Sequence, residues 1–184
     1  MKNISYFAVL FFLCSATSAQ EDFFRDPSVK IENTVLMCKA TSKTGYWVYD
    51  ASNDSIQIRG IEGVQLLNIK FKSQKAIHHV FCEVFSSVRL KELSESDKLL
   101  RMLLFVNNKG ELLKTEYSIP VNSKIKPSEI VKLDALMKQK FRFTTDEFER
   151  TENLILAVSQ PIRYEIILKG EKIRTWDEWE YPSM

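Results

Sequence analysis

The sequence has few of the residues and spacings that mark common functional classes. Its 184 residues include two histidines, three cysteines and five glycines, and the formal net charge is only +2. This charge balance lacks the basic field that nucleic-acid binding needs. The spacings HExxH, CxxC and GxSxG are also missing, so neither a zinc site nor a serine hydrolase is indicated. We therefore expect no cofactor and no nucleic-acid partner.

Long hydrophobic runs are missing too, apart from one short run near the N-terminus. Lys2 precedes an apolar stretch over residues 6–14, and small residues close the segment at 15–19. This layout is typical of a signal peptide, and the stretch is shorter than the ~20 residues that a membrane-spanning helix needs. We expect residues 1–19 to be removed on export, which leaves a periplasmic or extracellular protein with no transmembrane segment.

The few cysteines allow at most one disulfide in the exported chain. Cleavage after Ala19 would discard Cys14, and the bulky Leu13 before it argues against a lipid anchor at this cysteine. Cys38 and Cys82 remain, and in an oxidising compartment they could bond to each other. Two free thiols are the alternative, because Cys82 is expected to point away from the apolar stripe of its helix.

The N-terminal part of the exported chain is expected to contain an arm and then short strands. Residues 20–32 are mixed and charged and are interpreted as the arm. Residues 33–72 contain β-rich runs separated by turn residues, which predicts an antiparallel β-meander of about four strands. These runs cover residues 34–38, 46–49, 55–59 and 64–71.

The hydrophobic period then changes to that of a helix. Six apolar side chains recur at intervals of three and four and predict one helix over residues 77–88; they are Ile77, Val80, Phe81, Val84, Phe85 and Val88. Two apolar runs at 99–106 and 111–119, joined by a turn that ends in Gly110, predict a β-hairpin.

A second helix is expected to begin at Pro127 and to end near Lys140. Proline is favoured at the first position of a helix, and an apolar stripe follows it, made of Ile130, Leu133, Met137 and Phe141. Two strands are then expected, at 154–159 and 164–168, with Pro161 at a bend or a sheet edge.

This order of elements predicts an α+β fold, in which an antiparallel sheet carries two helices on one face. Residues 33–169 are expected to form a single domain, because no linker rich in glycine, proline or serine divides them. Within it, the meander of residues 33–72 precedes a helix, hairpin, helix and two strands over residues 73–169. Residues 170–184 are expected to form an aromatic and acidic tail.

The second half of the chain resembles a known family. The run Phe105-Val106-Asn107-Asn108-Lys109-Gly110-Glu111-Leu112, followed by a helix that starts at a proline and by a strand, resembles the C-terminal domain of TonB. The whole chain, with Arg89-Leu90-Lys91-Glu92-Leu93 ahead of the hairpin, is similar to small exported proteins of unknown function from Bacteroides-type bacteria.

The TonB resemblance implies a hairpin, a helix and an edge strand to which a partner peptide could add a strand. An exposed edge at residues 111–119 would allow such capture, whereas N-terminal strands that pair with this edge would prevent it. An energy-transducing role is not implied, because the chain lacks the uncleaved anchor and the proline-rich spacer of TonB.

Two aromatic clusters are the candidate partner or ligand surfaces. Alternation along one strand places Trp47 and Tyr49 on the same face, where they either pack or serve as stacking platforms. The second cluster lies in the acidic tail, which either folds back over an edge or binds a partner; it contains Trp176, Trp179 and Tyr181.

Metal and carboxylate sites are weaker interpretations of the sequence. His78 with Cys82, and His79 with Glu83, stand four residues apart, but a third ligand is missing, so solvated histidines are the preferred interpretation. Carboxylates at Asp146, Glu147, Glu149, Asp177 and Glu178 could act on glycosidic bonds. Their clustering is more typical of solvated loops.

The sequence therefore predicts a non-enzymatic protein-binding or assembly module of the periplasm or the cell exterior. The first alternative is a carbohydrate-binding module that uses exposed aromatic side chains. The second is an envelope glycan hydrolase that acts through carboxylates. An envelope protein or a glycan is thus the expected partner, and the sequence does not determine the oligomeric state.

Overall fold

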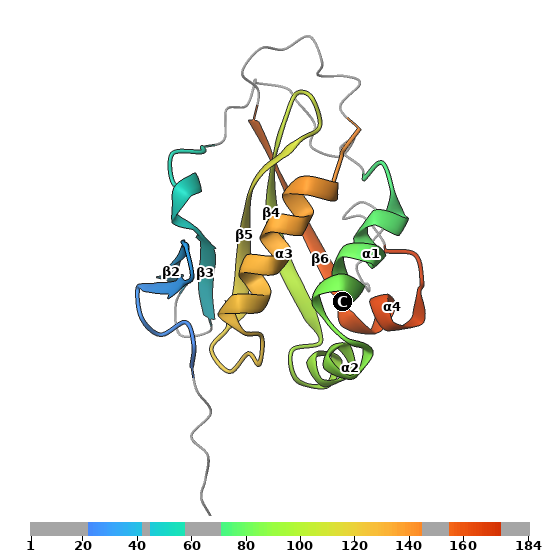
Figure 1. The fold of residues 1–184 in the computed structure, drawn as a ribbon, viewed down its shortest axis with the longest axis horizontal. Coiled ribbons are helices and arrows are strands. Elements are labelled where there is room, and N and C mark those ends of the chain that lie inside the picture. Colours follow the sequence, from blue (N-terminus) through green and yellow to red (C-terminus); the bar gives the residue numbers. More distant parts are fainter. Residues whose placement is uncertain (1–21, 42–44, 58–70, 145–154, 174–184) are drawn as a thin grey trace, which may run out of the picture.

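The protein folds as a six-stranded antiparallel sheet that carries four helices on one face, as the computed structural model shows for residues 22–41, 45–57, 71–144 and 155–173 (Figure 1). The strands lie in the order β1-β2-β3-β5-β4-β6. They are β1 (Ser28–Ile31), β2 (Thr34–Ala40), β3 (Gly45–Asp50), β4 (Leu99–Asn107), β5 (Leu112–Pro120) and β6 (Ile155–Arg163). The helices are α1 (Gln74–Val84), α2 (Ser87–Ser96), α3 (Pro127–Lys140) and α4 (Tyr164–Lys169), and a short 3₁₀ helix, η1 (Ala51–Asn53), follows β3. The predicted α+β class is confirmed.

The two halves of the chain share this one sheet. β3 pairs with β5, with Tyr46 opposite Ile119, so β5 lies between β3 and β4. β3 therefore covers the hairpin edge over residues 117–120, and strand capture is excluded along that part of it. β6 lies at the end of the sheet, which confirms the edge position predicted for Pro161.

The main core lies between the sheet and the helices. The apolar stripe predicted for the second helix is buried in full, from Ile130 on α3 to Phe141 directly after its end. It packs against alternate residues of the central strands, among them Leu104 on β4 and Tyr117 on β5. Each fully buried side chain of this size contributes roughly 2 kcal/mol relative to an exposed one.

The predicted helix over residues 77–88 is in fact two helices. α1 ends at Val84, and the side chain of Ser86 then accepts a hydrogen bond from the backbone N–H of Arg89 at 3.2 Å, which caps the start of α2. Serine is a strong N-cap residue, so it starts a new helix here instead of continuing the first. Val88, expected on the apolar stripe, is 78% exposed.

Three further predictions are corrected in the N-terminal region and near the C-terminus. The expected arm contains β1, which pairs with β2 through a turn at Glu32, whose φ is 51°. Ser55 to Gln57 are not in a strand, and most of the remaining meander, residues 58–70, lies outside the described residues. The predicted strand at 164–168 is the helix α4, which buries Tyr164 and Ile167 on one side.

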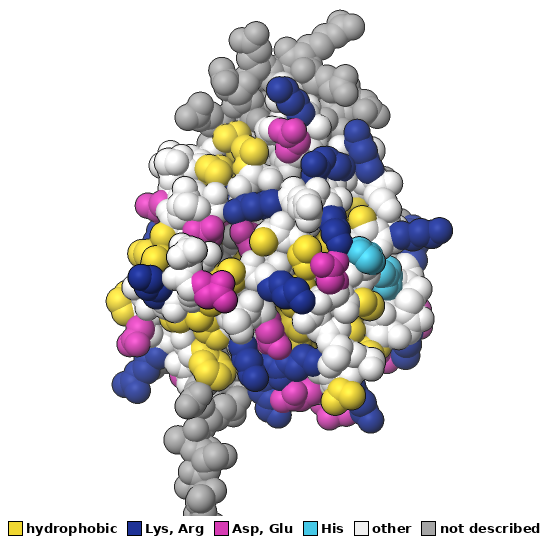
Figure 2. All heavy atoms as spheres, in the orientation of Figure 1, with side chains coloured by type: hydrophobic (Ala, Val, Ile, Leu, Met, Phe, Trp, Pro, Cys, Tyr) yellow, Lys and Arg dark blue, Asp and Glu magenta, His cyan; other side chains and the backbone are white. Residues whose placement is uncertain are grey.

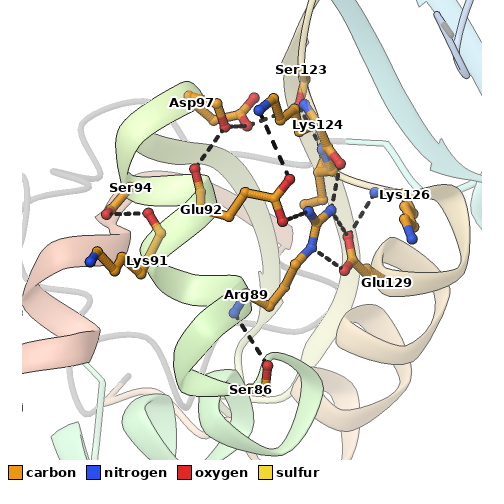
Figure 3. A network of polar contacts seen from close by, with 12 residues as sticks. Ser86, Arg89, Lys91, Glu92, Ser94, Asp97, Ser123, Lys124, Lys126 and Glu129 are labelled. Atoms are coloured by element: carbon orange, nitrogen blue, oxygen red, sulfur yellow. Dashed lines mark hydrogen bonds and ion pairs between the residues drawn. The ribbon is translucent and has the colours of Figure 1, made fainter. Parts of the chain in front are cut away.

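A network of charged side chains fastens α2 to the start of α3 (Figure 3). The Arg89 guanidinium donates to both carboxylate oxygens of Glu129, from Nε at 2.7 Å and from Nη2 at 2.9 Å. Nη1 donates to Glu92 at 2.6 Å, and the Lys124 carbonyl accepts a further bond. The Glu129 carboxylate raises the pKa of Arg89 above its usual value. Because Arg89 joins two helices and a loop, its role is structural.

Candidate functional site

The four described helices pack on one face of the sheet. We call the other face the helix-free face. Cross-strand partners fix its members, because Met37 on β2 lies opposite Tyr49 on β3 and Lys39 lies opposite Trp47. Trp47 and Tyr49 therefore share this face, as predicted. Tyr49 is only 2% exposed and yet lies outside the main core.

A straight row of side chains crosses the helix-free face over four adjacent strands. Lys39 lies opposite Trp47, Trp47 opposite Ser118, and Ser118 opposite Arg101. Three strand spacings make this Lys39–Arg101 row about 14 Å long. Trp47 is half-buried, whereas the two cations at the ends of the row are exposed. The row thus presents an aromatic ring between two positive charges.

The two cations of the row are weakly held by the fold. Lys39 Nζ lies 4.0 Å from a carboxylate oxygen of Asp54 and 4.9 Å from the centre of the Tyr49 ring. The side chain of Arg101 forms no hydrogen bond or ion pair with any part of the chain that the structure describes. Both charges are therefore available to an anionic partner.

On the same face of the sheet, Lys114 is held within the fold. Its ammonium lies 2.8 Å from Glu116, 4.3 Å from the centre of the Tyr49 ring and 5.1 Å from that of Phe105, and the residue is only 4% exposed. The Tyr49 hydroxyl donates to Asp54 at 2.8 Å. Burial of Tyr49 raises its pKa. Tyr49 is thus a packing residue, and of the two aromatic residues predicted on this strand Trp47 is the one that remains as a platform.

A pocket of about 230 Å³ lies on the other side of the sheet, between α3 and the strands β2 and β3. We call it the α3 pocket. Its residues on α3 follow a helical spacing and so share one face of that helix. The lining consists of Thr34, Leu36, Asp50, Val131, Asp134, Ala135 and Lys138.

Asp134 is the most deeply buried charged group of the α3 pocket. It is 6% exposed, accepts a hydrogen bond from the Tyr117 hydroxyl at 3.3 Å, and lies 2.7 Å from Lys138 Nζ. Burial raises the pKa of Asp134 and Asp50 adds to this increase, whereas Lys138 and the Tyr117 hydrogen bond oppose it. A buried carboxylate in a pocket is a candidate binding group.

Sequence reasoning missed Asp134, although the sequence carries a signal for it. Ile130, Leu133 and Met137 mark the core side of α3, and Asp134 occupies the adjoining position four residues after Ile130. Apolar residues are expected there in an amphipathic helix. A carboxylate at this position, followed by Lys138 four residues later, indicates a buried polar pair.

The histidines are engaged by other residues of the fold. His78 Nε2 lies 2.8 Å from the Glu171 carbonyl oxygen, and His79 lies 3.4 Å from Glu83. Figure 2 shows both rings at the surface of the helix-bearing face, among interspersed acidic and basic side chains. No group of three or more potential metal ligands exists among the described residues.

The other predicted site residues lie outside the described residues. They are the tail aromatics Trp176, Trp179 and Tyr181 and the carboxylates at Asp146, Glu147, Glu149, Asp177 and Glu178. In addition, none of the helices in the described ranges is long and apolar enough to cross a membrane.

Cys38 and Cys82, the two cysteines of the possible disulfide, are free thiols in this structure. Cys38 on β2 is buried in the main core, whereas Cys82 is exposed on α1. The helix α1 presents other residues to the core, namely Ile77, Val80 and Phe81. Cys38 thus lies in the core between the sheet and the helices, whereas Cys82 lies on the outer side of α1.

These environments predict very different thiol reactivities. In a chain carrying Cys14→Ser, we expect Ellman's reagent at pH 8 to label Cys82 rapidly and Cys38 only after unfolding. Burial, aided by the nearby Asp26 and Asp22, raises the pKa of Cys38 to about 11, and only a thiolate reacts. A Cys38→Ser variant should keep the fast phase unchanged; two equally fast equivalents would contradict the structure.

The fold is similar to that of a DUF5043 family protein from Bacteroides uniformis. The two share a TM-score of 0.60 over 90% of this chain and 96% of that chain, at 11% sequence identity. No protein-family model matches the chain, and no curated protein matches it significantly. The shared fold agrees with the sequence resemblance to proteins from Bacteroides-type bacteria. The TonB resemblance stays a prediction.

Proposed function

We propose that this chain is an exported, non-enzymatic binding module that holds an acidic glycan on its helix-free face. The observation that carries the proposal is the Lys39–Arg101 row. Trp47 offers a flat apolar ring for stacking, and the cations on either side suit carboxylate or sulfate groups. The row is longer than one sugar ring, so it suits an oligosaccharide.

Export is supported by the signal-peptide layout of residues 1–19. An exported protein meets the polysaccharides of the cell envelope and the surroundings, where uronic acids and sulfated sugars occur. The absence of catalytic spacings in the sequence supports binding without turnover.

A protein partner is the second candidate, and β6 is the observation that favours it. The sequence left open the capture of a partner strand at the hairpin edge, but β5 lies inside the sheet. β6 is a nine-residue edge strand that pairs with β4. A strand at the end of a sheet offers backbone groups to an added peptide.

A glycan array with the exported form of the chain tests the proposal. We expect uronate or sulfate oligosaccharides to bind and their neutral counterparts to bind much less. Trp47→Ala should weaken binding by about tenfold through loss of ring stacking, and Arg101→Ala should weaken it in a salt-dependent way. Val88→Ala, a change at an exposed apolar residue on α2, is the matched control.

Four outcomes distinguish the candidates. Equal binding of neutral and acidic glycans, or unchanged binding by Trp47→Ala, would contradict the acidic-glycan proposal. A purified envelope protein that binds Trp47→Ala as tightly as the unchanged chain would support the β6 edge instead. Turnover of any bound glycan would overturn the non-enzymatic proposal.

A further inference from the structure

We propose that the α3 pocket binds a small primary ammonium compound with a short aliphatic body. This site lies on the opposite side of the sheet from the Lys39–Arg101 row and does not depend on the function proposed for that row. Its ligand is deduced from the charge, the free acceptor atoms and the size of the pocket.

The charge of the α3 pocket favours a cation. Asp50 and Asp134 line it from β3 and α3, and Lys138 is the only cation among the lining residues. One negative charge is therefore in excess. Burial is the main cause of the raised pKa of Asp134, and the charge of Asp50 adds to it, so the two carboxylates lie within electrostatic reach of each other.

Both carboxylates retain acceptor capacity for a ligand. An ionised carboxylate has about four acceptor positions on its two oxygens. Asp50 uses Oδ1 to accept from the Ser52 backbone N–H at 2.9 Å. Asp134 accepts one long bond from Tyr117 and pairs with Lys138 through its other oxygen. An ammonium group has three donors and can bond to both carboxylates.

The walls of the α3 pocket suit a short aliphatic body. Leu36 on β2 and Val131 and Ala135 on α3 supply apolar surface, and Thr34 supplies a hydroxyl. A volume of about 230 Å³ is smaller than the 300 Å³ or more that drug-sized ligands occupy. The ligand is thus a small amine, and an anion would be repelled by the excess negative charge.

Titration with n-butylammonium chloride, followed by amide chemical shifts of the exported chain, tests the site. We expect saturable shifts at Val131, Ala135 and Asp50. n-Butanol, which has the same aliphatic body without the charge, should bind at least about tenfold more weakly, since it lacks the charge-assisted bonds. Sodium chloride at equal concentration controls for ionic strength.

Two variants that keep the side-chain shape locate the binding groups. Asp50→Asn and Asp134→Asn should each weaken n-butylammonium binding by about tenfold, whereas Glu95→Gln on α2 should leave it unchanged. Asp50 is only half-buried, so its variant remains informative if Asp134→Asn lowers stability. Trp47→Ala should also leave this binding unchanged, which separates it from the glycan test.

Two results would overturn the proposal. The first is a set of shifts that do not saturate or that n-butanol reproduces at equal concentration. The second is binding that both aspartate variants retain. Saturable binding that either aspartate variant loses would support it.

Discussion

Replacement of Gly110 by alanine is expected to lower the free energy of unfolding by about 3 kcal/mol or more. Gly110 has a φ of 74°, a conformation that costs any other residue energy, and an added Cβ would overlap the backbone carbonyl oxygen of Phe143. The Phe143 N–H donates to the Gly110 carbonyl at 3.0 Å, so the hairpin turn and the segment after α3 cannot move apart freely. Urea unfolding measures the change.

Gly170 provides the matched control for this substitution. Its φ of 65° is similar, but an added Cβ would meet nothing within 4 Å. Gly170→Ala should therefore lower the free energy of unfolding by only about 1 kcal/mol, which is the energy that alanine needs to adopt a positive φ. If the two substitutions had equal effects, the close approach of Phe143 to Gly110 would be contradicted.

The second large effect is expected for Arg89→Ala, which should lower the free energy of unfolding by about 2 to 4 kcal/mol. The substitution removes both bonds to Glu129 and leaves that carboxylate, whose side chain is 16% exposed, without its main partner. The link between α2 and α3 is lost at the same time. Thermal unfolding should show a Tm lower by roughly 5 to 15 °C.

Two controls separate the geometry of Arg89 from its charge. Arg89→Lys keeps the charge but cannot donate from a planar fork, so it should recover only part of the loss. Lys91→Ala, at an exposed position of the same helix, should change stability by no more than about 0.5 kcal/mol. Full recovery by lysine would mean that charge alone holds the helices together.

The sequence predicted those elements that are determined by residues within the element itself. Pro127 at the first position and the stripe that follows it define α3, and Gly110 defines the turn between β4 and β5. In each case one residue type meets a backbone requirement that few others can meet. The resulting α+β class followed from the order of these elements.

The failures have equally local causes. α4 is six residues long, too short for a 3.6-residue period to be visible, and its Tyr164, Ile166 and Ile167 are residues favoured in strands. The left-handed Gly170 after Lys169 was the available signal for a helix end. The pairing of β3 with β5 could not be predicted from either segment alone, because it joins residues about 70 positions apart.

The candidate site was predicted in part. Alternation placed Trp47 correctly, because a strand has a strict period of two. The burial of Tyr49 could not be foreseen, since it depends on Lys114, which lies over its ring from another strand. The cations that flank Trp47 were also missed, because their positions depend on the register of β2, β3, β5 and β4.

The pairing of β3 with β5 also has a consequence for the order of folding. While the chain emerges residue by residue, β1, β2 and β3 exist before β5, so β3 has an unpaired edge until Tyr46 meets Ile119. Contacts between distant positions form slowly, and an open edge meanwhile invites aggregation. A chain stopped before residue 112 should therefore need a chaperone to remain unaggregated, whereas one that extends through Pro120 can close its own sheet.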